Sequence, residues 1–124
     1  MLNKFLMVIA GGGTGALLRY SIGLLIPKAS ESAFPWATLL VNLLGCLAIG
    51  IFYKLYYQEE AYRLLLITGL LGGFTTFSSF GMESYQLILS KKWDFFAFYF
   101  TATNLFGILC VWLGSRLPAI FSTN

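Results

Sequence analysis

Four long apolar runs, separated by short polar connections, constrain this chain more than any other feature of its sequence. They cover residues of about 5–26, 35–57, 62–89 and 95–117. A helix of about 20 mostly apolar residues is long enough to cross a bilayer. Only 10% of the residues are charged, whereas a soluble domain carries about 25%. We therefore expect an all-α membrane protein with four transmembrane helices.

The connections between the runs are too short to hold a domain outside the membrane. We expect residues 1–124 to form a single integral membrane domain in the inner or plasma membrane. Lys4 precedes the first apolar run, as a basic residue does in a signal peptide. That run continues past its glycines and three further runs follow, which favours a retained helix.

The composition argues against catalysis and against nucleic-acid binding. Histidine is absent, and neither Cys46 nor Cys110 has a second metal ligand at a suitable spacing. No nucleophile and base are paired, so we expect no enzyme activity. The net charge is +3, but the basic residues are scattered at the ends of the apolar runs, where they anchor helices to lipid headgroups. Nucleic acid, which requires a basic patch, is not an expected partner.

The basic residues are divided almost evenly between the two sides of the membrane. Four spans place both termini on one side, which collects four of them: Lys4, Lys54, Arg63 and Arg116. The other side collects three, with Arg19 nearby: Lys28, Lys91 and Lys92. The positive-inside rule needs an excess on one side to set the orientation. Either a weak bias is sufficient, or the chain inserts in both orientations and pairs antiparallel.

The third run contains the most specific segment, GGFTTFSSF at residues 72–80. Two glycines followed by two β-branched threonines are a poor helix interior, so we expect the third helix to be broken here. A break leaves backbone carbonyls unpaired at membrane depth, which is tolerated only where they are buried in protein or line a cavity. Carbonyl oxygens without a carboxylate suit a monovalent cation better than Mg²⁺.

Polar side chains recur at helical spacing within the runs. Thr38 and Asn42 are four residues apart in the second run, and Tyr99 and Thr103 are four apart in the fourth. Amide and hydroxyl donors with few acidic groups favour a path for anions over one for cations. Equally, a buried asparagine can simply join two helices, and Arg19 can either snorkel to the headgroups or face an aqueous vestibule.

Three stretches together resemble one family, the Fluc (CrcB) fluoride channels. They are GGGTGALLRY at 11–20, FPWATLLVNLLG at 34–45 and GGFTTFSSF at 72–80, and the likeness covers essentially the whole chain. The resemblance implies an antiparallel, dual-topology homodimer with two fluoride pores and a structural Na⁺ at its centre. It also implies passive export of F⁻, which lowers the toxicity of fluoride to the cell.

The resemblance further implies roles for individual residues. Asn42 would donate to fluoride, and Phe77 and Phe80 would present the positive edges of their rings to it. The backbone carbonyls of Gly72 and Thr75 would hold the sodium ion.

The rest of the implied fluoride path lies on all four spans. Arg19 would lie near a vestibule. Tyr99 and Thr103 would belong to a polar track, although the family tends to carry serine where this chain has Thr103 and Gly107. The remaining members would form a hydrogen-bonded group near one end of a pore: Thr38, Ser79 and Glu83.

Two other functions fit a small four-span protein. A small multidrug transporter couples to protons through a carboxylate in its first span, and this first span has none. A non-conducting assembly protein would only pack its helices, so it would tolerate apolar replacements at Asn42 and at the two phenylalanines.

Overall fold

The computed structural model describes residues 1–30 and 33–121. Over these residues the chain is helical and contains no strand. The first two rods are single helices, α1 (Leu2–Leu25) and α2 (Trp36–Tyr56). The third rod consists of α3 (Glu60–Tyr62), the π-helix η1 (Arg63–Leu71), α4 (Gly72–Phe74) and α5 (Phe77–Leu89). The fourth consists of α6 (Trp93–Thr101), the π-helix η2 (Ala102–Phe106) and α7 (Gly107–Phe121).

All four rods are long and apolar enough to cross a membrane. By length and composition the candidate spans are Leu2–Leu25, Trp36–Tyr56, Glu60–Leu89 and Trp93–Ile120. The expectation of an all-helical chain with four membrane-spanning helices is therefore confirmed over the described residues. The boundaries differ by a few residues, most at the end of the last helix, where we expected Pro118 to end the helix and α7 continues through it to Phe121. A proline this close to a helix end removes one backbone hydrogen bond and still permits another turn.

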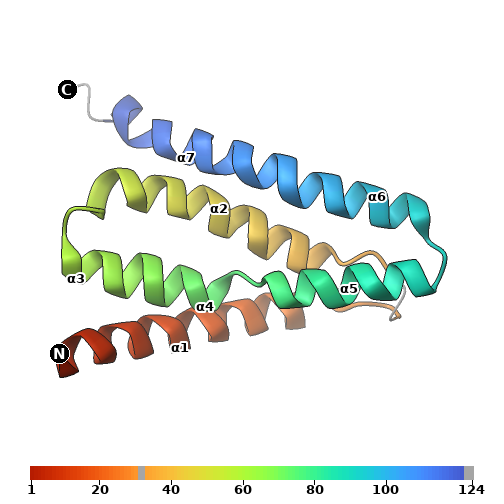
Figure 1. Ribbon diagram of the computed structural model, residues 1–124, viewed down its shortest axis with the longest axis horizontal. Coiled ribbons are helices and arrows are strands. Elements are labelled where there is room, and N and C mark those ends of the chain that lie inside the picture. The colour runs from red at the N-terminus through yellow and green to blue at the C-terminus, as the bar shows by residue number, and fades with distance from the viewer. Residues whose placement is uncertain (31–32, 122–124) are drawn as a thin grey trace.

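Successive rods run in opposite directions (Figure 1), so the start of α1 and the end of α7 lie at the same end of the molecule. The helix α1 packs against η1 and α4, while α2 packs mainly against α7 and also touches η1. The helices α5 and α6 contact each other at the opposite end.

Glycines allow α1 and the third rod to approach within backbone contact. A Cβ atom added at Gly11 would meet the backbone of Leu65, and one added at Gly69 would lie 3.0 Å from the Cα of Gly11. A Cβ atom at Gly73 would likewise overlap the backbone of Gly12. In lipid, close packing of this kind drives helix association. Two pairs of glycines with the spacing GxxxG, Gly11/Gly15 and Gly69/Gly73, therefore lie on the faces where the first and third rods meet.

Between α4 and α5 the chain is extended for two residues, Thr75 and Thr76, which Figure 1 shows as a thin segment in the third rod. Their ψ angles are 158° and 110°. The Thr76 hydroxyl accepts a hydrogen bond from the backbone N–H of Ser79 (3.2 Å). Thr76 is therefore the N-cap of α5, a position that favours threonine over continued helix.

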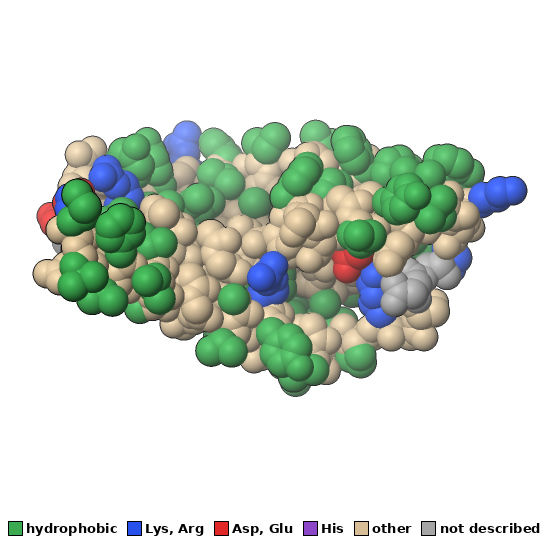
Figure 2. Space-filling view, turned by 60° about the horizontal axis from the view of Figure 1, so that its bottom comes forward, with side chains coloured by type: hydrophobic (Ala, Val, Ile, Leu, Met, Phe, Trp, Pro, Cys, Tyr) green, Lys and Arg blue, Asp and Glu red, His purple; other side chains and the backbone are tan. Residues whose placement is uncertain are grey.

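A small core lies where α2, α5 and α6 meet, and apolar side chains cover much of the remaining surface. The buried cluster consists of Leu39, Phe80, Leu87, Tyr99 and Ala102. On the face shown in Figure 2, hydrophobic side chains extend along the whole molecule, and most charged side chains lie toward its two ends. This is the distribution that a bilayer requires, with lipid around the middle and headgroups at the ends.

Candidate functional site

The amide of Asn42 holds the extended segment of the third rod. Asn42 lies on α2 and is only 9% exposed. Its Oδ1 atom accepts from the backbone N–H of Thr76 (2.8 Å), and its Nδ2 atom donates to the backbone carbonyl of Thr76 (3.1 Å). Both polar backbone groups of Thr76 are thus paired without a helix. Of the two alternatives for Asn42, the structure shows the interhelical contact directly.

Two backbone N–H groups in this segment donate to side chains instead of to the carbonyls that would accept from them in a continuous helix. In a continuous helix the Gly72 carbonyl would accept from the N–H of Thr76, which donates instead to Asn42. The Thr75 carbonyl would accept from the N–H of Ser79, which donates instead to Thr76 Oγ1. Neutral oxygens deprived of their helical donors, with no carboxylate within the segment, are ligands that suit Na⁺. The chemistry of Gly72 and Thr75 therefore fits the expected cation.

A cavity of about 330 Å³ lies beside this segment. Its lining includes Asn42, Thr75, Phe77, Phe80 and Thr103. The rings of the two phenylalanines are 5.5 Å apart, and Phe80 is buried (5% exposed) whereas Phe77 is 79% exposed. The Thr103 hydroxyl is buried and has no hydrogen-bond partner among the described residues. The cavity thus combines aromatic rings with an amide and an uncommitted hydroxyl.

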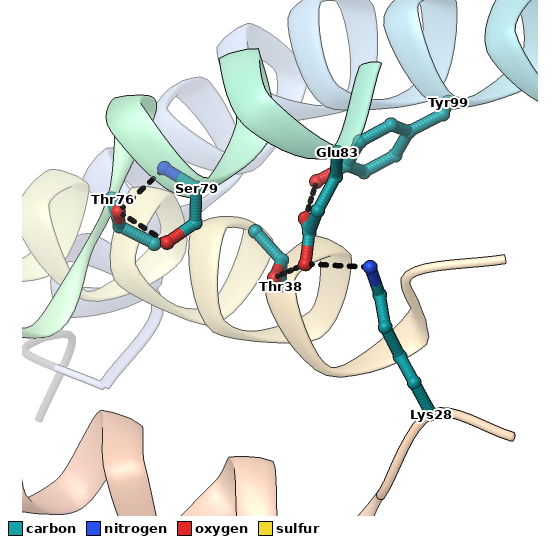
Figure 3. Close-up of polar contacts among 6 residues, drawn as sticks. All are labelled: Lys28, Thr38, Thr76, Ser79, Glu83 and Tyr99. Atoms are coloured by element: carbon teal, nitrogen blue, oxygen red, sulfur yellow. Dashed lines mark hydrogen bonds and ion pairs between the residues drawn. The ribbon is translucent and has the colours of Figure 1, made fainter. Parts of the chain in front are cut away.

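A second polar cluster surrounds the Glu83 carboxylate (Figure 3). The Thr38 hydroxyl donates to Oε1 (2.9 Å), and the Tyr99 hydroxyl donates to Oε2 (2.7 Å). The Lys28 ammonium lies 3.4 Å from Oε1, reaching it from the segment that follows α1. Both oxygens of the only carboxylate in the predicted site are therefore engaged by donors.

Of the predicted group of Thr38, Ser79 and Glu83, the structure joins Thr38 and Glu83 by a hydrogen bond and gives Ser79 a different partner. The Thr76 hydroxyl donates to Ser79 Oγ (3.0 Å), and Figure 3 shows these two residues as a separate pair. Capping is the physical reason, because Ser79 is the third residue of α5 and lies next to its N-cap. Ser79 still lines a hollow of about 370 Å³ together with Lys28 and Glu83.

The predicted polar track on the fourth rod is also divided. Tyr99 is fully buried and donates to Glu83, while Thr103 faces the cavity beside the break. The turn between them passes from α6 into the π-helix η2, whose i→i+5 hydrogen bonds change the winding. Both residues still lie near Phe80, whose ring is 5.0 Å from that of Tyr99 and which lines the same cavity as Thr103.

Arg19 is half-buried on α1, away from the contacts described above. It forms no hydrogen bond or ion pair with any residue in 1–30 or 33–121. Its unpaired charge remains compatible with either reading of the sequence, headgroup anchor or vestibule.

Two residues that shape the site were absent from the sequence prediction. Thr76 is the capping residue and the partner of Asn42, and its position three residues before Ser79 resembles a capping box, which could have identified it. Lys28 was interpreted only as a basic residue at the end of a span. No local pattern pairs it with Glu83, 55 positions later, so only the tertiary structure could reveal the contact.

Comparison with known proteins gives consistent matches along the chain. The family described as CrcB-like protein, Camphor Resistance (CrcB), matches residues 6–115. A relative from Phocaeicola vulgatus, named fluoride-specific ion channel FluC, is 43% identical over 116 residues, which is 91% of this chain and 96% of the relative. A relative of the same name from Chloroflexus aurantiacus is 42% identical over 124 residues, covering 97% of this chain and 98% of the relative.

The matched region includes the second and third rods, most of the first and fourth, and every residue of the site described above. Together with four apolar helices of membrane-spanning length, this kinship makes the chain a multi-pass integral membrane protein of the cell membrane. By sequence, by span number and by the match over residues 6–115, the chain belongs to the CrcB-like family.

Proposed function

We propose that this protein is a passive, fluoride-selective ion channel that exports F⁻ and thereby lowers the toxicity of fluoride to the cell. The observation that carries the proposal is the full-length similarity to relatives named fluoride-specific ion channels. The chemistry of the site supports it, because the cavity offers an amide, a hydroxyl and two phenyl rings to a small anion.

These groups bind an anion without trapping it. The Nδ2 atom of Asn42 has two hydrogens, and the contact with Thr76 uses one of them. The ring edges of Phe77 and Phe80 carry only partial positive charge. Conduction requires binding that is favourable enough for entry and weak enough for exit, which donors of this strength provide.

The proposed channel is a dual-topology homodimer of antiparallel chains. The near-even distribution of Lys and Arg supports insertion in both orientations. The exposure of Phe77 supports pairing, because a single chain leaves this ring 79% exposed beside the cavity. A second copy crossing at the break would complete the wall.

The proposed dimer holds one structural Na⁺ on its two-fold axis. The Gly72 and Thr75 carbonyls of each chain would supply 2 × 2 = 4 oxygens. Because the ion binds only the assembled state, replacing Na⁺ with a large organic cation on both sides should weaken the dimer and reduce fluoride flux. Unchanged flux and unchanged dimer stability after exhaustive exchange would contradict the sodium site.

Fluoride efflux from liposomes tests the function itself. Purified protein is reconstituted in vesicles loaded with potassium fluoride, valinomycin is added to carry the counter-ion, and a fluoride electrode records release. We expect rapid release driven only by the fluoride gradient and slow release of chloride in parallel vesicles. Release that requires an imposed proton gradient would identify a coupled transporter instead. Release equal to that of protein-free vesicles would favour a non-conducting assembly protein.

A further inference from the structure

We propose that Lys28 supplies the counter-charge of the ion path. On this reading, which rests on the proposed fluoride conduction, its ammonium offsets the Glu83 carboxylate so that a small anion can pass the hollow these two residues share. Lys28 is then a positioning and electrostatic residue of the path, in addition to anchoring the end of the first span.

The geometry places the pair at the wall of a polar opening. Lys28 Nζ lies 3.4 Å from Glu83 Oε1, and the side chains are 27% and 14% exposed. The hollow of about 370 Å³ that they line is shared with Ser78 and Ser79. The interaction energy of an exposed surface ion pair is small. This pair is mostly shielded from water, and charges interact more strongly away from water.

The hollow and the cavity are lined by different faces of the first two turns of α5. Phe77 and Phe80 face the cavity, while Ser79 and Glu83 face the hollow. An anion that moves between water and the cavity by this side therefore passes close to the carboxylate. The hydroxyls of Thr38 and Tyr99 donate to that carboxylate but add no positive charge.

The other ion pair among the described residues offers a contrast. Lys4 and Glu60 lie 2.7 Å apart, but both side chains are more than half exposed and neither lines the hollow or the cavity. Of the two ion pairs seen among the described residues, only Lys28 and Glu83 can act on an ion in the path.

The test compares fluoride efflux from liposomes at low ionic strength for the wild type and three variants. Lys28→Gln removes the charge, Lys28→Arg keeps it, and Lys91→Gln is the matched control. Lys91 lies on the same side of the membrane, so its loss changes the topology-determining charge count equally. It has no contact with Glu83 in the described structure.

We expect Lys28→Gln to slow efflux about tenfold, because an uncompensated carboxylate repels the anion. Lys28→Arg should stay within about twofold of the wild type, since arginine keeps the charge, and Lys91→Gln should match the wild type. The deficit of Lys28→Gln should shrink in part with added impermeant salt, because the Debye length falls from about 30 Å at 0.01 M to about 3 Å at 1 M and salt screens the approach of the anion through water more than it screens the partly buried carboxylate. A structural defect would not respond to salt in this way.

Several results would overturn the inference. Equal efflux from Lys28→Gln and Lys91→Gln would do so while leaving the proposed channel intact. A deficit that neither salt nor Lys28→Arg relieves would show a structural role instead. Wild-type efflux no faster than from empty vesicles would instead overturn the proposed function, and this inference with it.

Gel filtration in detergent checks whether Lys28→Gln folds. A second experiment does not depend on the folding of that variant. Lys28→Cys is reconstituted and treated with either aminoethyl or methyl methanethiosulfonate, which attach a charged and a neutral group. The wild type is treated in parallel because it contains Cys46 and Cys110. Faster efflux after the charged reagent alone supports the counter-charge, and equal responses to both reagents contradict it.

Discussion

Replacing Asn42 should destabilise the fold through the backbone of Thr76. Asn42→Ala removes both hydrogen bonds to that residue (2.8 and 3.1 Å) and leaves a buried N–H and a buried carbonyl without partners. An unsatisfied buried polar group costs about 1–3 kcal/mol, so the two together cost about 2–6 kcal/mol. The adjoining cavity can admit water to them, which places the expected loss near the lower half of that range, about 3 kcal/mol.

Asn104→Ala is the matched control. Asn104 is exposed, and its Nδ2 atom donates to the carbonyl of Phe100 one turn earlier in its own rod (2.7 Å). Its loss should change the free energy of unfolding by less than about 0.5 kcal/mol. Asn42→Asp is a second informative variant, because it keeps an acceptor for the Thr76 N–H but sets an oxygen against the Thr76 carbonyl. We expect it to lose at least as much stability as Asn42→Ala.

The free energy of unfolding is measured by denaturant titration in detergent micelles, with tryptophan fluorescence as the signal. Hydrogen exchange of peptides covering residues 75–80 locates the effect, because the Thr76 amide should lose its protection. If Asn42→Ala and Asn104→Ala destabilise equally, or if exchange at 75–80 does not change, the amide does not hold the break and the reasoning is wrong.

Three further predictions follow from the packing, the rings and the charges. Gly15→Ala places a Cβ atom on the backbone of Leu70 and should destabilise the fold by about 2 kcal/mol. Gly13→Ala, with no described atom within 4 Å of the added Cβ atom, should be neutral or slightly stabilising. Equal unfolding midpoints for the two variants would contradict this prediction. Phe77→Ile and Phe80→Ile should both reduce fluoride efflux. Only Phe80→Ile, which replaces a buried ring, should also lower stability, by about 1 kcal/mol. Unchanged efflux would show that the rings do not contribute to the fluoride path. Two or three lysines added to the loop at residues 28–32 should fix one orientation and abolish activity unless an oppositely biased copy is co-expressed, and full activity from the fixed form alone would argue against antiparallel pairing.

Much of the site could be predicted because local chemistry specifies it. Asn42 stands out as an amide in an apolar run, and residues 72–80 are a poor helix interior, so both were identified from the sequence. The connection between them was not, because it joins backbone atoms of Thr76 to a side chain 34 positions earlier. Helical spacing predicts which residues share a face but not their partners: Thr38 donates to Glu83 while Asn42 pairs with Thr76, and Tyr99 donates to Glu83 while Thr103 lines the cavity.

Composition and the lengths of the apolar runs are enough to predict that this chain lies in lipid and that it is helical. A chain with 10% charged residues and four long apolar runs must satisfy its backbone inside lipid, and helices of membrane length accomplish this within each segment. Which polar groups meet depends on the packing of the rods. Ser79 is bonded to the capping residue Thr76, while Lys28, Thr38 and Tyr99 come from three other segments to surround the Glu83 carboxylate. Such contacts depend on how the helices cross and on which acceptor lies nearest to each donor, and the spacing of residues along one helix specifies neither.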